Sequence, residues 1–261
     1  MSYGQWTLGI PIVVACCLSA GMPAIGVGVY KAGKHIRPNP GEENGCMNPV
    51  TTHMLMTVTH LGAATTILPV LPAIWFGLWM ERRHTVVVAW STTLFIGALV
   101  TLISKLAFIG WGLGVASLDF TGVSGHTLLA TAILPVVFSL LPLSRPWSAL
   151  AFILGLCLVV LVGWSRVVLG AHSWSEVVAG WCLGALISGS VLVLMRLSMR
   201  NHPVLPGMRW LIATSLLVMS VFSQSIAETL PVQPLVVDLA LKLSGHEHPF
   251  NRTDLHRLAG N

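Results

Sequence analysis

The stretch SRVVLGAHSWSE, residues 165–176, joins two apolar runs at about 147–168 and 173–196. Each run reaches the roughly 20 residues that an α-helix needs to cross the hydrocarbon core of a bilayer. The stretch itself holds three ionisable side chains, those of Arg166, His172 and Glu176. Ionisable groups at membrane depth are energetically costly, and their presence indicates a functional site. We therefore predict two consecutive membrane helices with a functional site where they meet.

The whole chain has the composition of a polytopic membrane protein. Of its 261 residues, 54% are hydrophobic and only 9% are charged, against roughly 25% charged residues in soluble domains. Apolar runs predict seven membrane segments, at about 8–30, 54–80, 85–113, 125–142, 147–168, 173–196 and 208–226. The predicted fold class is all-α, a polytopic membrane helical bundle with about six to seven transmembrane helices.

The segments predict a single integral membrane domain over residues 1–226, followed by a C-terminal tail over residues 227–261. The chain starts without a basic region before its first apolar stretch, so no cleaved signal peptide is expected. In the tail, PLVVDLALKLSG at 234–245 shows an apolar face at helical spacing, interrupted by Asp238 and Lys242. This pattern is typical of an amphipathic helix at a membrane interface.

Arginine residues gather in three of the loops between segments, at 80–84, 143–148 and 196–209. The positive-inside rule places these loops in the cytoplasm. The loops at 114–124 and 168–173 then face the opposite side, as does the tail. The 31–53 loop falls on that side too, although it carries Lys31, Lys34 and Arg37. We therefore predict that the functional site lies at the face of the membrane opposite to the cytoplasm.

Charge and cysteine content argue against several kinds of site. The formal net charge is +5, but the basic residues form no stripe with interleaved aromatic residues, so no nucleic-acid partner is expected. The five cysteines are scattered and show no CxxC or Cys/His spacing. We therefore expect no disulfide framework, no metal site and no cofactor.

Seven residues are expected to meet near the outer face: Lys105, Ser124, Gly125, His126, Arg166, His172 and Glu176. Arg166 and Lys105 offer positive charge to phosphoryl oxygens, and the helix N-terminus at 124–126 offers N–H groups to an anion. His172 and Glu176 are four residues apart, so the carboxylate can orient the imidazole as a nucleophile or base. His126 is then available as a proton donor. For Asp119, we expect a turn role or a pairing with Lys105 or Arg166.

These residues resemble the motifs of the type 2 phosphatidic acid phosphatase superfamily, over roughly residues 54–197. Its third motif is similar to Ser165-Arg166, five residues, His172, three residues, Glu176, and its second motif to residues 123–126, Val-Ser-Gly-His. Glu176 replaces the family aspartate and Val123 replaces a proline. In the first motif Lys105 matches, but Gly112 and Leu113 stand where the family has Arg-Pro. One phosphate-binding arginine of the family is therefore missing.

The resemblance implies a six-helix phosphatase core and a metal-independent lipid phosphatase. It implies hydrolysis of a phosphomonoester or pyrophosphate through a phosphohistidine intermediate on His172, with undecaprenyl pyrophosphate, phosphatidylglycerol phosphate, phosphatidic acid and lipid A phosphates as candidate substrates. The implied partners are membrane lipids and a lipid phosphate substrate, and the sequence indicates no protein partner. Two alternatives remain: a lipid phosphotransferase of the same fold, and a non-catalytic lipid-binding or transport protein on a degenerate scaffold.

Overall fold

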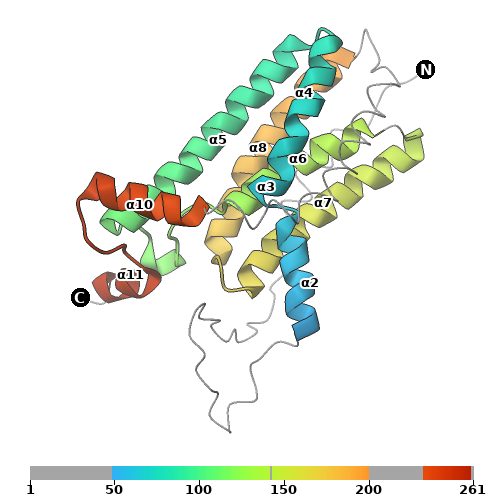
Figure 1. Cartoon of the computed structure of the whole chain (residues 1–261). Coiled ribbons are helices and arrows are strands. Elements are labelled where there is room, and N and C mark those ends of the chain that lie inside the picture. Colours follow the sequence, from blue (N-terminus) through green and yellow to red (C-terminus); the bar gives the residue numbers. More distant parts are fainter. Residues whose placement is uncertain (1–48, 142, 200–231, 260–261) are drawn as a thin grey trace. The chain divides into compact units, whose positions relative to one another are not determined.

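The computed structural model describes residues 49–141, 143–199 and 232–259, which belong to one compact unit (Figure 1). The described residues are helical, and their only β pairing is an isolated bridge between Val115 and Phe120. The all-α fold class is therefore confirmed. The first and last predicted membrane segments, at 8–30 and 208–226, lie outside the described residues.

Three described helices are long and apolar enough to cross a membrane: α5 (His84–Trp111), α7 (Arg145–Val168) and α8 (Trp174–Met199). Their outward faces carry large apolar side chains, such as Phe95 with 68% and Leu186 with 71% of its surface exposed. An apolar outward face on a long helix is the face that lipid solvates. These helices confirm three of the predicted segments and an integral membrane protein.

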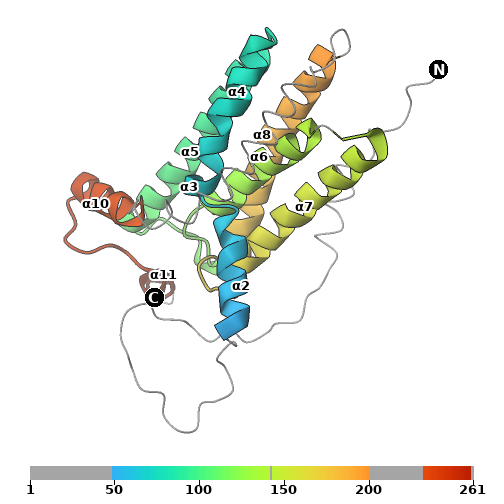
Figure 2. The same cartoon turned by 45° about the vertical axis from the view of Figure 1, so that its right-hand side comes forward.

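The predicted segment 54–80 is a broken span instead of one continuous helix. It consists of α2 (Pro49–His60), α3 (Ala64–Ile67), the 3-10 helix η1 (Leu68–Val70) and α4 (Leu71–Met80), and its two halves are bent by 53°. Figure 2 shows α2 and α4 running in different directions. Gly62 lies at the break, where a Cβ atom would be 2.7 Å from Val162 Cγ1 and 2.9 Å from the His126 carbonyl oxygen. The break therefore allows a close approach of the chain to α6 and α7.

Helix α6 (Gly125–Leu140) packs between α7 and α8 and is buried on most of its faces. Its 16 residues span about 24 Å at 1.5 Å per residue. Gly180 and Gly184 of α8 face α6, and Cβ atoms there would lie 2.9 Å from the Ser124 carbonyl oxygen and 2.7 Å from that of Leu128. Small residues four apart let two membrane helices approach closely. This contact fixes the start of α6 beside the start of α8.

The described part of the tail forms α10 (Val232–Ser244) and α11 (Arg252–Ala259). Helix α10 packs across the C-terminal part of α5 (Figure 1), with Ala240 fully buried. Helix α11 contacts the 3-10 helix η2 (Ala116–Leu118) in the loop between α5 and α6. The helix at 234–245 is thus present, and its place at the membrane interface stays a prediction.

Candidate active site

The seven predicted site residues come from four helix ends that the antiparallel packing brings to one end of the bundle. Lys105 lies near the end of α5 and Arg166 near the end of α7, while α6 and α8 begin there. The segment before α6 lies against α5, because the Val123 N–H donates to Ser104 Oγ at 3.1 Å and a Cβ at Gly122 would lie 3.3 Å from Lys105 Cγ.

His172 and Glu176 form a short hydrogen-bonded pair. His172 Nδ1 lies 2.6 Å from Glu176 Oε2, and the Ser173 N–H donates to the same oxygen at 3.2 Å. Since an ionised carboxylate can only accept, Nδ1 carries the proton and Nε2 has the free lone pair. Burial lowers the pKa of His172, as do the cations Arg166 and Lys105, against the opposing effect of Glu176. The lowered pKa favours a neutral imidazole with a lone pair on Nε2.

The turn between α7 and α8 positions His172. The N–H groups of Ala171 and His172 both donate to the Arg166 carbonyl oxygen, at 3.0 and 3.2 Å, and close the end of α7. Gly170 has a φ of 65° in this turn, a left-handed conformation that suits glycine. The backbone thus connects the predicted phosphate-binding arginine directly to the predicted nucleophile.

The carboxylate of Glu176 is fully buried and accepts several further hydrogen bonds. Thr121 donates to Oε1 from its N–H at 2.7 Å and from its hydroxyl at 2.5 Å. The Ser124 N–H donates to the Glu176 backbone carbonyl oxygen at 3.2 Å. These bonds attach the segment containing the second motif to the start of α8, so the two motifs form one site.

Lys105 and Arg166 make no ion pair with any residue of the described ranges. Arg166 Nε is buried without a hydrogen-bond partner there. Both cations act electrostatically on His126 and His172, so both lie near the two histidines. A buried cation without a partner is costly unless a bound anion supplies one. The arrangement is therefore suited to a phosphate group.

At the start of α6, the Ser124 hydroxyl is buried and pairs with Thr127 Oγ1 at 2.9 Å. The N–H groups of the next residues, Gly125 and His126, belong to the first helical turn and have no intrahelical acceptor, so they can donate to an anion. The nearest atom to a Cβ at Gly125 would be Thr101 Cγ2 at 3.6 Å, an ordinary contact, so protein packing does not require glycine here.

A residue at the site that the sequence did not indicate is Arg252 of α11. Its Nη2 donates to both carboxylate oxygens of Glu176, at 3.0 and 3.1 Å, and its Nη1 donates to Asp119 at 2.5 Å. The expected pairing of Asp119 with Lys105 or Arg166 is wrong, because its partners are Arg252 and His256. Its turn role is confirmed, since Asp119 ends η2 with a φ of 49°. The only signal in the sequence was the prediction that the tail lies on the same side as the site.

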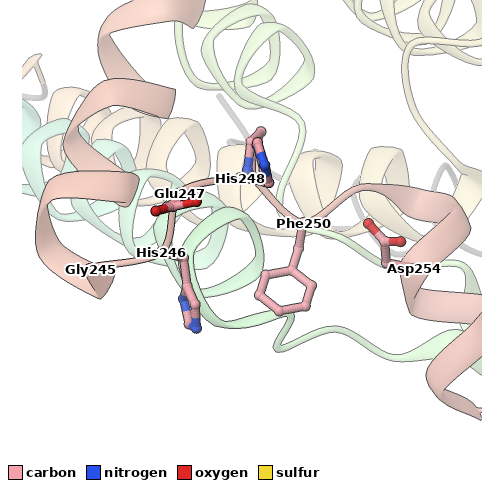
Figure 3. Close-up of a pocket in the computed structure, with 7 residues that line it drawn as sticks. Gly245, His246, Glu247, His248, Phe250 and Asp254 are labelled. Atoms are coloured by element: carbon pink, nitrogen blue, oxygen red, sulfur yellow. The ribbon is translucent and has the colours of Figure 1, made fainter.

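An open hollow on the tail is separate from these residues (Figure 3). It is lined by residues 245–250 and Asp254, none of which belongs to the predicted site. Within the described ranges, no group of three His, Cys, Asp or Glu side chains could hold a metal ion.

Comparisons with known proteins agree with the motifs. The PAP2 superfamily model matches residues 110–200, which include every predicted site residue except Lys105. A Klebsiella pneumoniae relative, a 22.5 kDa protein in the cps region, is 36% identical over 206 residues, covering 77% of this chain and 97% of the relative. Phosphatidylglycerophosphatase B of Bacillus subtilis is 26% identical over 147 residues, covering 53% of this chain and 72% of that protein.

A solved structure, a transmembrane PAP2-type phosphatidylglycerolphosphate phosphatase from Bacillus subtilis, matches with a TM-score of 0.45 and 25% identity. The match covers 59% of this chain and 81% of that one. The Klebsiella relative is matched over nearly its full length, and the family model covers the two motifs that the site contains. The chain therefore belongs to the PAP2 superfamily, and it is a membrane phosphatase of that family.

Proposed function

We propose that this protein removes a phosphate group from a membrane lipid, acting on a phosphomonoester or pyrophosphate bond at the periplasmic face of a bacterial inner membrane. The observation that carries the proposal is the His172–Glu176 pair, 2.6 Å apart, beside two cations without ion-pair partners among the described residues. A mere phosphate-binding site needs the cations alone. An imidazole oriented by a buried carboxylate adds a nucleophile.

The proposed reaction has two steps. His172 Nε2 attacks phosphorus and forms a P–N bond, while the bond from phosphorus to the leaving oxygen breaks and His126 gives that oxygen a proton. Water then attacks the phosphohistidine, His126 accepts a proton from it, and the P–N bond breaks to release phosphate and neutral His172. Arg166, Lys105 and the N–H groups at the start of α6 hold the phosphoryl oxygens, and Glu176 stabilises the positive imidazole of the intermediate.

A lipid substrate is supported by the place of the site. It lies where α5, α6, α7 and α8 end or begin, and these helices present apolar faces outward. The similarity to phosphatidylglycerophosphatase B of Bacillus subtilis makes phosphatidylglycerol phosphate the first lipid to test. Undecaprenyl pyrophosphate and phosphatidic acid complete the panel, since the roles proposed for the phosphate-binding groups involve only the phosphoryl oxygens.

The test is phosphate release by purified protein from these three lipids. His172→Ala should be inactive on all of them, and should yield no acid-labile phosphoenzyme on rapid quenching with labelled substrate. His126→Ala should lose roughly 10²–10⁴-fold on a lipid monoester and much less on p-nitrophenyl phosphate, whose leaving group departs without a proton. His53→Ala, at an exposed position of α2, is the matched control and should behave as wild type. A phosphoenzyme that persists in His172→Ala would move the nucleophile elsewhere.

Sidedness has a separate test in a variant without the five native cysteines. A cysteine at the exposed position Ala171 should react with an impermeant thiol reagent added outside spheroplasts, and one at the exposed position Arg82 should not. The reverse labelling would place the site at the cytoplasmic face.

A further inference from the structure

Arg252 reaches the buried acid of the site from the C-terminal tail. Its side chain is 35% exposed, and its Nη2 contacts both oxygens of Glu176, which is 0% exposed. Thr121 and His172 bind the same carboxylate through its Oε1 and Oε2 atoms, respectively. The described structure therefore gives Glu176 one permanently charged partner, and that partner is Arg252.

Independent contacts dock the tail beside the site. The Phe250 N–H donates to the Ile109 carbonyl oxygen at 3.0 Å, and His246 Nδ1 lies 2.8 Å from the Gly110 carbonyl oxygen. Figure 3 shows the rings of His246 and Phe250 on the same side of the tail loop, where they meet edge to face. Leu255 of α11 is buried as well. Arg252 thus lies in an anchored segment instead of on a free end.

The position of the missing motif arginine lies against this segment. Gly112 has a φ of 69°, and a Cβ there would lie 3.0 Å from the Phe250 ring. A side chain at 112 would be strained by its backbone conformation and would meet the tail. An arginine side chain at 112 would therefore crowd the docked ring of Phe250, and the docked tail brings an arginine of its own.

We propose that residues 245–259 complete the active site, with Arg252 as a positioning residue that holds Glu176 in place behind His172. This inference rests on the proposed function of His172 as the nucleophile. A buried carboxylate needs a counter-charge while the nucleophile is neutral, and Arg252 supplies it. Without Arg252, a proton on His172 becomes the nearest source of that charge, and a protonated His172 has no lone pair on Nε2.

Other charged groups face the pair from each packed element: Lys105 of α5, His126 of α6, Arg166 of α7 and Asp119 of the α5–α6 loop. Lys105 and Arg166 oppose protonation of His172. Asp119 accepts a hydrogen bond from Nη1 of Arg252 and carries the opposite charge. A variant of Arg252 keeps Lys105, His126 and Arg166, and Asp119 loses the same partner as Glu176, so a change in the pH profile reports the loss of the Arg252 charge.

The test compares Arg252→Gln with Arg257→Gln, a matched control on α11 whose side chain is 75% exposed and pairs only loosely, at 3.8 Å, with Asp254. Arg252→Gln should lower kcat about tenfold to a hundredfold with KM little changed, because the lost contact is charge-assisted. It should also move the acid limb of the pH profile of kcat/KM to higher pH.

Arg252→Lys should restore part of kcat. In a Glu176→Gln background, removing Arg252 should cause no further loss. Wild-type kcat and an unshifted acid limb in folded Arg252→Gln would overturn the inference.

A spectroscopic readout separates this inference from the proposed function. In protein with ¹⁵N-labelled histidine, the Nδ1 proton shared with Glu176 should give a far-downfield resonance that is missing in His172→Ala. That resonance should shift in Arg252→Gln and stay in place in Arg257→Gln. Wild-type protein inactive on every lipid would refute the proposed function alone, whereas an unshifted resonance in Arg252→Gln would refute the role of Arg252 alone. If Arg252→Gln does not fold, Arg252→Lys carries both measurements.

Discussion

The helix junction at 165–176 and the docked tail at 245–259 each bring an arginine to the same site, and the two arginines are used differently. Arg166 has a buried Nε without a hydrogen-bond partner among the described residues. Arg252 is hydrogen-bonded to two carboxylates, because its Nη2 donates to Glu176 and its Nη1 donates to Asp119. A buried cation that lacks a partner costs stability, and a paired one much less. We infer that Arg166 binds the phosphate group of the substrate, whereas Arg252 stabilises the buried carboxylate of Glu176.

Of the variants that distinguish the two regions, Arg166→Gln should have the largest effect on kcat/KM. Two charge-assisted contacts to phosphoryl oxygens should be lost, each worth about 1.5–3 kcal/mol. We therefore expect kcat/KM to fall at least about a hundredfold, since ~1.4 kcal/mol is a factor of ten. The measurement is steady-state hydrolysis of phosphatidylglycerol phosphate.

Thermal unfolding sharpens this prediction. Arg166→Gln removes a half-buried cation whose Nε has no hydrogen-bond partner among the described residues, so its Tm in the absence of substrate should not fall. Arg252→Gln breaks an ion pair to a buried carboxylate, so its Tm should fall. A large loss of Tm in Arg166→Gln would show that the protein itself satisfies Arg166, and the contrast between the two arginines would disappear.

A smaller effect is expected for Lys105→Ala, the second cation without an ion-pair partner in the described ranges. A lysine offers a point charge without the planar fork of arginine. We expect turnover to slow at least about tenfold, which corresponds to the loss of one charge-assisted contact. Lys242→Ala is the control, since Lys242 is exposed and pairs with Asp238 on α10. Unchanged kinetics in folded Lys105→Ala would mean that its ammonium group points to the membrane interface instead of to the substrate.

The sequence could predict the parts of the site that depend on local spacing. His172 and Glu176 are four residues apart, and Glu176 in the first turn of α8 reaches back to His172, which lies in the turn just before that helix. The sequence could not show the contact between Arg252 and Glu176, which lie 76 positions apart, because no periodicity connects a tail residue with a membrane helix. The break at Gly62 was missed for a similar reason. Hydropathy is continuous across 54–80, and the break depends on a close approach to Val162 and His126.

The smallest effect, none at all, is expected when divalent metal is removed. In a metal-dependent phosphatase, the metal neutralises the phosphoryl oxygens and is held by carboxylates. Here the cations Arg166 and Lys105 lie near the proposed nucleophile, His172. The one carboxylate next to it, Glu176, already accepts bonds from Thr121, His172, Ser173 and Arg252. Both of its oxygens already accept hydrogen bonds, so a metal would have to displace Arg252 or the imidazole.

Phosphate release should therefore be the same before and after extensive dialysis against EDTA, in wild type and in Arg252→Gln alike. A complete loss of activity that one divalent ion restores would contradict the proposed roles of Arg166 and Lys105.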